Sequence, residues 1–72
     1  MTDLQQKYLD THKDELVSKS NHELLYLYAL ASRKHVEMAF DQHEDAPFQL
    51  KIVNIIYSEV IKRMDKGAPE HV

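Results

Sequence analysis

The chain has 72 residues, a formal net charge of −3 and no cysteine. This length allows one domain over 1–72, and the missing cysteine excludes disulfides, thiolate metal ligands and cysteine nucleophiles. The acidic balance disfavours a general nucleic-acid binder. The longest apolar run is far shorter than the roughly 20 residues that cross a bilayer, and the polar N-terminus lacks a signal-peptide pattern. We therefore expect a soluble, cytoplasmic protein without a transmembrane segment.

Residues 2–17 are predicted to form an amphipathic helix. Thr2 and Gln5 have the spacing of a capping box, and Asp3 suits the positive end of a helix dipole. Apolar and aromatic side chains then recur at helical spacing along one arc, at Leu4, Tyr8, Leu9, His12 and Leu16.

A second helix is predicted over 21–40, and it begins at another capping box formed by Ser20 and Glu23. This helix is apolar on nearly all sides over its first two turns. Its inward face is predicted to include Leu24, Leu27, Tyr28, Ala31, His35, Met38 and Ala39. Almost opposite that face is a row of residues that resembles a contact surface more than a solvated one: Tyr26, Leu30, Arg33 and Glu37.

A third helix is predicted over 46–66, with Pro47 in its first turn and a frayed tail at 67–72. Its basic residues Lys62, Arg63 and Lys66 suit the negative end of the helix dipole. The helix carries two apolar faces. One comprises Val53, Ile56, Tyr57, Val60 and Met64, and the other comprises Phe48, Ile52 and Ile55.

These elements predict an all-α fold, in which helices 21–40 and 46–66 form an antiparallel hairpin and helix 2–17 completes a three-helix, bundle-like domain. A core of this size rarely supplies more than about 3–5 kcal/mol, so short chains often depend on disulfides, metals or oligomerisation. The two-sided apolar helices therefore predict a homo-oligomer, with a dimer as the first choice.

No catalytic, cofactor-binding or metal-binding residues are predicted. No two of the five histidines stand three or four residues apart, the spacing that a helical metal pair needs; they are His12, His22, His35, His43 and His71. A single glycine does not build a phosphate-binding loop. His12 and His35 are expected at the boundary of the core, and whether either has a pH-linked role stays open.

Two blocks of sequence carry a resemblance to a known family. The blocks consist of Ser20, Glu23–Leu25 and Tyr28–Ala29, followed after a turn by Ile55–Ile56 and Glu59–Arg63. This outline is similar to small bacterial helical-hairpin inhibitors of sporulation histidine kinases, over about residues 20–64. The spacing between the blocks is longer here. The resemblance implies that a chain of this design can act as a stoichiometric regulator.

We therefore expect a small regulatory protein that acts by protein–protein contact, as an inhibitor, antagonist or accessory factor of bacterial or phage type, without catalysis. The predicted contact residues are Tyr26, Leu30, Arg33, Glu37, Phe48, Ile52 and Ile55. Which set closes the oligomer and which binds a partner is left open. The alternatives are a dimeric nucleic-acid-associated regulator and a cytoplasmic accessory of a membrane-bound complex.

Overall fold

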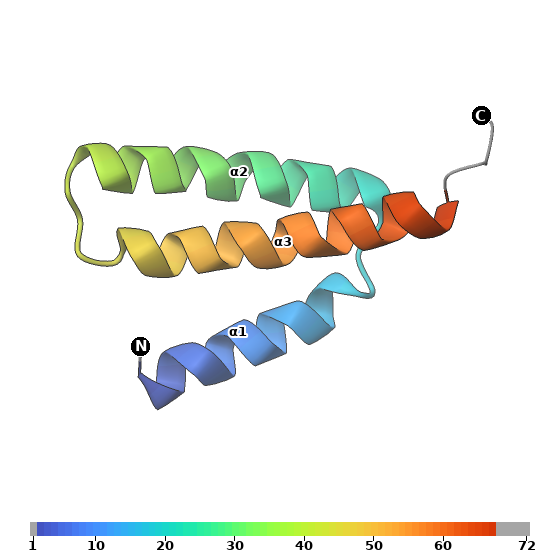
Figure 1. Ribbon diagram of the computed structural model, residues 1–72, viewed down its shortest axis with the longest axis horizontal. Helices are drawn as coiled ribbons and strands as arrows, with labels where there is room; N and C mark the ends of the chain where they lie inside the picture. The colour runs from blue at the N-terminus through green and yellow to red at the C-terminus, as the bar shows by residue number, and fades with distance from the viewer. Residues whose placement is uncertain (1, 68–72) are drawn as a thin grey trace.

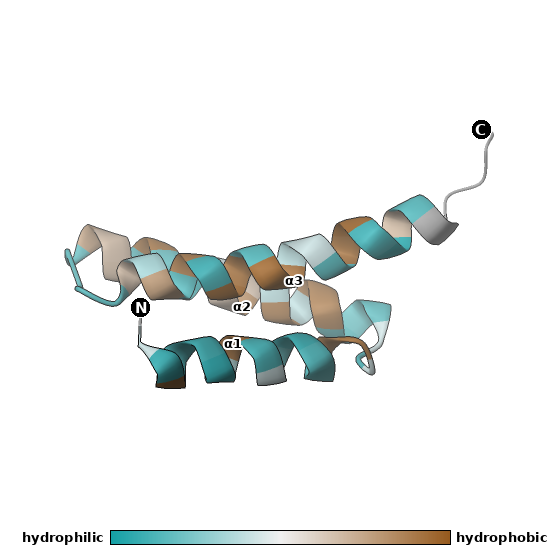
Figure 2. Ribbon diagram, turned by 60° about the horizontal axis from the view of Figure 1, so that its bottom comes forward, coloured by the Kyte–Doolittle hydropathy of each residue, from teal (hydrophilic) through white to brown (hydrophobic). Residues whose placement is uncertain are grey.

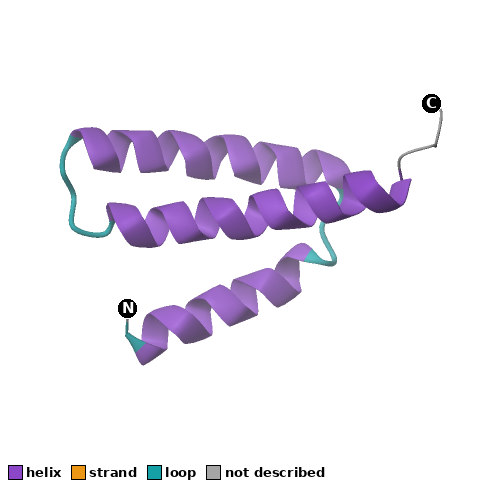
Figure 3. Cartoon of the chain, viewed as in Figure 1, coloured by secondary structure: helices purple, strands orange, loops and turns teal. Residues whose placement is uncertain are grey.

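The computed structural model describes residues 2–67, and within that range it contains three helices and no strand (Figures 1 and 3). The helices are α1 (Asp3–Leu16), α2 (Asn21–Phe40) and α3 (Ala46–Gly67). The all-α prediction with three helices is confirmed. Gly67 belongs to α3, and the rest of the predicted tail, 68–72, lies outside the described residues.

Both capping boxes predicted from the sequence are present. At the start of α1, the Gln5 amide donates to the Thr2 hydroxyl at 3.1 Å, and the Thr2 amide donates to the Gln5 side chain at 3.0 Å. At the start of α2, the Glu23 amide donates to Ser20 Oγ at 3.1 Å, and the Ser20 amide donates to Glu23 Oε1 at 2.9 Å. These reciprocal bonds satisfy amides that the first turn of a helix leaves free.

The helices α2 and α3 lie side by side and run in opposite directions, and α1 packs along the other side of α3 (Figure 1). The molecule measures 43 × 26 × 17 Å between Cα atoms. The contacts of α1 are mainly with α3 and not with α2, so the helices follow one another in the order α2, α3, α1. Within residues 2–67, no third helix covers the side of the α2–α3 pair that lies away from α1.

The buried apolar core consists of six residues, and at its centre each helix contributes one fully buried side chain; Leu9, Ala46 and Val53 complete the buried set. Leu16, Leu24 and Ile56 are each about 1% exposed and pack together near the connection between α1 and α2. Partly buried residues surround this cluster, and they are Leu27, Tyr28, Ala31, Ile52, Ile55 and Val60. Further along the hairpin, the buried Gln49 side chain donates from Nε2 to the Ala31 carbonyl at 3.2 Å and so joins α3 to α2.

Arg63 connects all three helices beside this core. Its Nη2 donates to the carbonyls of Leu16 and Val17 at the end of α1, each at 3.1 Å. Its Nη1 donates to Asn21 Oδ1 at 2.9 Å, and its Nε pairs with Glu59 at 3.0 Å. The last carbonyls of a helix carry partial negative charge, so the guanidinium also acts as a C-terminal cap of α1. The sequence assigned Arg63 to the dipole of its own helix, whereas its bonds go mainly to α1 and α2.

Replacement of Arg63 by Met is expected to destabilise the protein by about 2 kcal/mol, because charged hydrogen bonds to several helices are lost while the aliphatic stem is kept. Urea unfolding followed by circular dichroism measures this change. The exposed neighbour Lys62→Met is the matched control, and its effect should stay within about 0.5 kcal/mol. Equal effects of the two substitutions would contradict the connecting role of Arg63.

The start of α2 should respond to pH through Glu23. Hydrogen bonds from the Ser20 backbone and side chain lower the pKa of the Glu23 carboxyl below its usual 4.5. The ionised carboxylate therefore stabilises the fold above that ordinary pKa, and this contribution disappears as the pH falls through the lowered, folded-state pKa.

We expect Glu23→Gln to be less stable than the wild type at about pH 7, and the difference to shrink towards zero at about pH 2–3. Urea midpoints across this range measure the effect. Glu44→Gln, in the exposed loop, is the control. If the urea midpoints of the wild type and Glu23→Gln differ by the same amount at both ends of this pH range, ionisation of the Glu23 carboxyl does not contribute to stability.

Candidate functional site

The four residues predicted on the outside of α2 form one exposed row, called here the outer row: Tyr26, Leu30, Arg33 and Glu37. Tyr26 is 65% exposed and Leu30 is 46% exposed. Arg33 Nε lies 4.0 Å from Glu37 Oε2, and these two side chains are 80% and 65% exposed. The structure therefore brings all four together on the surface, with two apolar groups followed by a solvated ion pair.

The residues predicted on α3 have a different environment, because they lie on the side of α3 that faces α1. The ring of Phe48 lies 5.9 Å from the ring of Tyr8, between centroids. Ile52 and Ile55 are partly buried and pack against the core cluster. The two predicted sets are thus separate in space: the outer row is open to solvent, while α1 covers much of the set on α3.

A second exposed apolar surface lies on the hairpin, and sequence reasoning did not single it out. Tyr28 of α2 and Tyr57 of α3 are in contact across the pair, with ring centroids 5.9 Å apart. Five apolar or aromatic residues on the same side are between 41% and 64% exposed. We call this surface the tyrosine face; it comprises Leu25, Tyr28, Val36, Leu50, Tyr57 and Met64.

The tyrosine face lies on the opposite side of α3 from α1. Phe48, Glu59 and Arg63 point towards α1, as their contacts or partial burial show. Leu50 and Tyr57 each stand two residues away from one of these, which is about 200° around a helix. In Figure 2, α1 is coloured mostly hydrophilic, whereas hydrophobic bands recur along α2 and α3.

The tyrosine face carries no formal charge among the described side chains of α2 and α3. Counted at about 100° per residue, every Asp, Glu, Lys and Arg falls outside the arc that holds this face. On α2 these are Glu23, Arg33, Lys34 and Glu37, and on α3 they are Lys51, Glu59, Lys62, Arg63 and Asp65. The outer row, by contrast, contains one charge of each sign.

The sequence contained a signal for this face that was assigned differently. The helical period predicts Tyr28 on the inward face of its helix, and Tyr57 and Met64 on one of the two apolar faces of theirs. The helical period gives the direction of a side chain on its own helix, but it does not tell how much of that face a neighbouring helix covers. The missing charges on matching arcs of both helices are the feature that distinguishes the tyrosine face, and they are visible in the sequence once the helices are known to pair.

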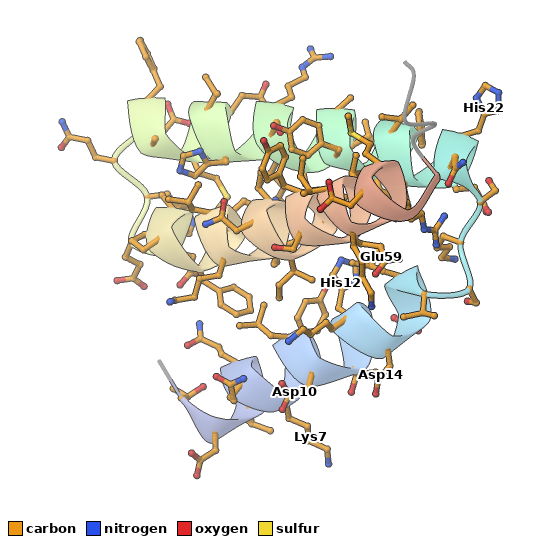
Figure 4. The ribbon with its side chains drawn as sticks, turned by 45° about the vertical axis from the view of Figure 1, so that its right-hand side comes forward. Lys7, Asp10, His12, Asp14, His22 and Glu59 are labelled. Atoms are coloured by element: carbon orange, nitrogen blue, oxygen red, sulfur yellow. The ribbon has the colours of Figure 1, made fainter. Side chains whose placement is uncertain are left out.

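Polar side chains line an open groove of about 470 Å³ between α1 and α3. The groove carries both signs of charge, among them Lys13, Asp14, Glu59 and Lys62. His12 points from α1 towards α3 and stacks on Tyr8, with its Nε2 buried and without a hydrogen-bond partner (Figure 4). Within residues 2–67, no three His, Asp or Glu side chains gather as metal ligands.

Within residues 2–67, none of the helices combines the length and the hydrophobicity that a membrane span requires. Comparison with protein-family models, with curated proteins and with solved structures finds no match to this chain. The surfaces themselves are therefore the basis for any proposal about function.

We expect α1 to detach from α3 while the hairpin of α2 and α3 stays folded, because α1 packs less extensively on the rest of the fold than α2 and α3 pack on each other. Leu9 is a buried residue of α1. Leu9→Ala should weaken the docking of α1 by about 2 kcal/mol or more, which corresponds to roughly 30-fold faster amide exchange in α1.

Hydrogen exchange resolved by residue measures this prediction. Amides of α2 around Leu27 should change far less than those of α1. Leu4→Ala, at a site that is 80% exposed, is the matched control and should leave exchange unaltered. A uniform rise through all three helices would show that α1 unfolds only with the whole molecule.

Proposed function

We propose that this chain is a small regulatory protein that acts by protein–protein contact, as an inhibitor, antagonist or accessory factor, and that it performs no catalysis. The observation that carries this proposal is the exposure of Tyr26 and Leu30 on the outer row. Large apolar side chains grouped at a surface are typical of interaction sites.

The chemistry of the outer row suits recognition of another protein. Tyrosine and arginine are among the residues that dominate the energetics of protein interfaces. The ion pair between Arg33 and Glu37 is long and solvated, so it contributes little to the stability of the free protein. Both charged groups therefore remain available to pair with opposite charges on a partner, which favours one partner over others.

We further propose that the active form is an antiparallel hairpin of residues 21–40 and 46–66 with the N-terminal helix docked on it, assembled into a homodimer in the cytoplasm. Contacts within the hairpin support the first part, because Tyr28 meets Tyr57 and Gln49 bonds to Ala31. The small core supports the second part, since short chains without disulfides often gain stability from association.

Capture of a partner from an extract of the source cells tests this proposal. The tagged wild-type protein should retain one host protein at salt concentrations that screen surface charge. Leu30→Asp should reduce capture by about tenfold or more, because a charge replaces an apolar group at the contact. Leu4→Asp, on an exposed site of α1, should capture the partner like the wild type.

The other classes of function give different results in the same assays. A nucleic-acid-associated regulator would bind labelled DNA, with an affinity that falls steeply as salt is added. An accessory of a membrane-bound complex would be recovered with membranes only when one specific membrane protein is present. Either result, or capture that Leu30→Asp leaves unchanged, would overturn the assignment of the outer row.

A further inference from the structure

We propose that the tyrosine face is the self-association surface of this protein, and that its occupant is the tyrosine face of a second copy related by a two-fold axis. This inference deepens the function proposed above, because it assigns one surface to the dimer and leaves the outer row for a different protein.

The absence of charge on the tyrosine face suits a contact between two identical copies. In a two-fold dimer the same patch occurs on both sides of the interface, so residues near the axis meet copies of themselves. A charged residue there would face a like charge, which is unfavourable in a desolvated contact. The tyrosine face contains no Asp, Glu, Lys or Arg among the described side chains, and it is therefore compatible with its own copy. In the outer row, Arg33 and Glu37 avoid this repulsion only if the axis passes between them, so that each meets the opposite charge of the second copy.

The size of the face suits the centre of a dimer interface. The face extends from Leu25 to Val36 on α2 and from Leu50 to Met64 on α3, which is about 17 and 21 Å at 1.5 Å per residue. Two neighbouring helices of this length, each about 10 Å wide, give roughly 400 Å² in projection, and corrugated helical surfaces expose more than their projection. A standard interface buries about 800 Å² on each partner. The face therefore supplies the central part of the area that a stable dimer needs, and the residues flanking it would supply the rest.

The position of the face makes the contact geometrically simple. Because α1 lies on the opposite side of α3, no other helix of the described part of the chain covers this side of α2 and α3. Two such hairpins packed face to face give a four-helix core, a stable arrangement for amphipathic helices. The α1 helices would then lie on the outside of the dimer.

The small core gives the association its energetic reason. Each helix contributes one fully buried side chain, and the chain has no cysteine for a disulfide. Burial of Leu25, Val36 and Met64 against a second copy would add apolar surface that the single chain leaves in water. The association would thereby enlarge the core around the contact between Tyr28 and Tyr57.

Sedimentation equilibrium over a range of concentrations tests this inference on the full chain. The wild type should have twice the mass of the 8.5 kDa chain. Val36→Glu and Met64→Glu each put a charge on the tyrosine face at an exposed position, and each should raise the dimer dissociation constant by about tenfold or more. Circular dichroism should show unchanged helix content.

Two matched controls separate the surfaces. Leu4→Glu places the same charge on an exposed site of α1, and Leu30→Glu places it on the outer row. Both variants should remain dimeric. A wild type that stays monomeric at every concentration, or a dimer that Leu30→Glu disrupts while Val36→Glu leaves it intact, would overturn the inference.

A second measurement does not depend on charge variants. The chain has no cysteine, so Tyr57→Cys and Leu4→Cys each provide a single site for a nitroxide label. The distance between labels in the dimer should be shorter at position 57 than at position 4. A distance at position 57 that equals or exceeds the other would contradict the proposed interface.

These results are distinguishable from a failure of the proposed function. A dimer that depends on Val36, in a protein that captures no partner, would support the interface and contradict the regulatory proposal. Conversely, capture of a host protein that depends on Leu30, by a chain that is monomeric at all concentrations, would support regulation and reject the dimer.

Discussion

The guanidinium of Arg63 lies where the end of α1, the start of α2 and the last third of α3 meet. Its partners are two backbone carbonyls, one amide oxygen and one carboxylate, which occupy all three of its nitrogens. Lysine would provide a single point charge in this place, whereas the planar fork of arginine bonds in several directions at once. The side chains of Arg63 and Glu59 are 25% and 13% exposed, so the pair is better shielded from water than the pair of Arg33 and Glu37.

This connection decides which apolar face of the hairpin is covered. Arg63 holds the carboxyl end of α1 on one side of α3, and the contact between Tyr8 and Phe48 extends the docking towards the amino end. Phe48, Ile52 and Ile55 therefore lose much of their exposure. The other side of the hairpin keeps its exposed apolar residues, since α1 packs mainly on α3 and no other helix within residues 2–67 lies there.

The sequence predicted the local features of this fold and not the long-range ones. Ser20 and Glu23 are three residues apart, so the start of α2 follows from short-range hydrogen bonds. Arg63 donates to the carbonyl of Leu16, 47 residues away, and the spacing of neighbouring residues does not predict such a contact. For the same reason the exposed row of Tyr26 and Leu30 was identified from one helix, whereas the tyrosine face requires knowledge of how two helices pair and where the third lies.

The two exposed surfaces differ in chemistry in a way that suits two different occupants. A charge-free face tolerates its own copy, while a face with one arginine and one glutamate gains specificity from a partner with complementary charges. Both surfaces are on α2, with their centres about a third of a turn apart and Arg33 and Val36 at the edge between them, so one helix would serve both contacts. In a two-fold dimer closed through the tyrosine faces, each outer row stays accessible and the protein carries two copies of it. Two linked copies raise the apparent affinity for a partner that is itself dimeric. A chain with so small a core would thus gain stability and avidity from the same association.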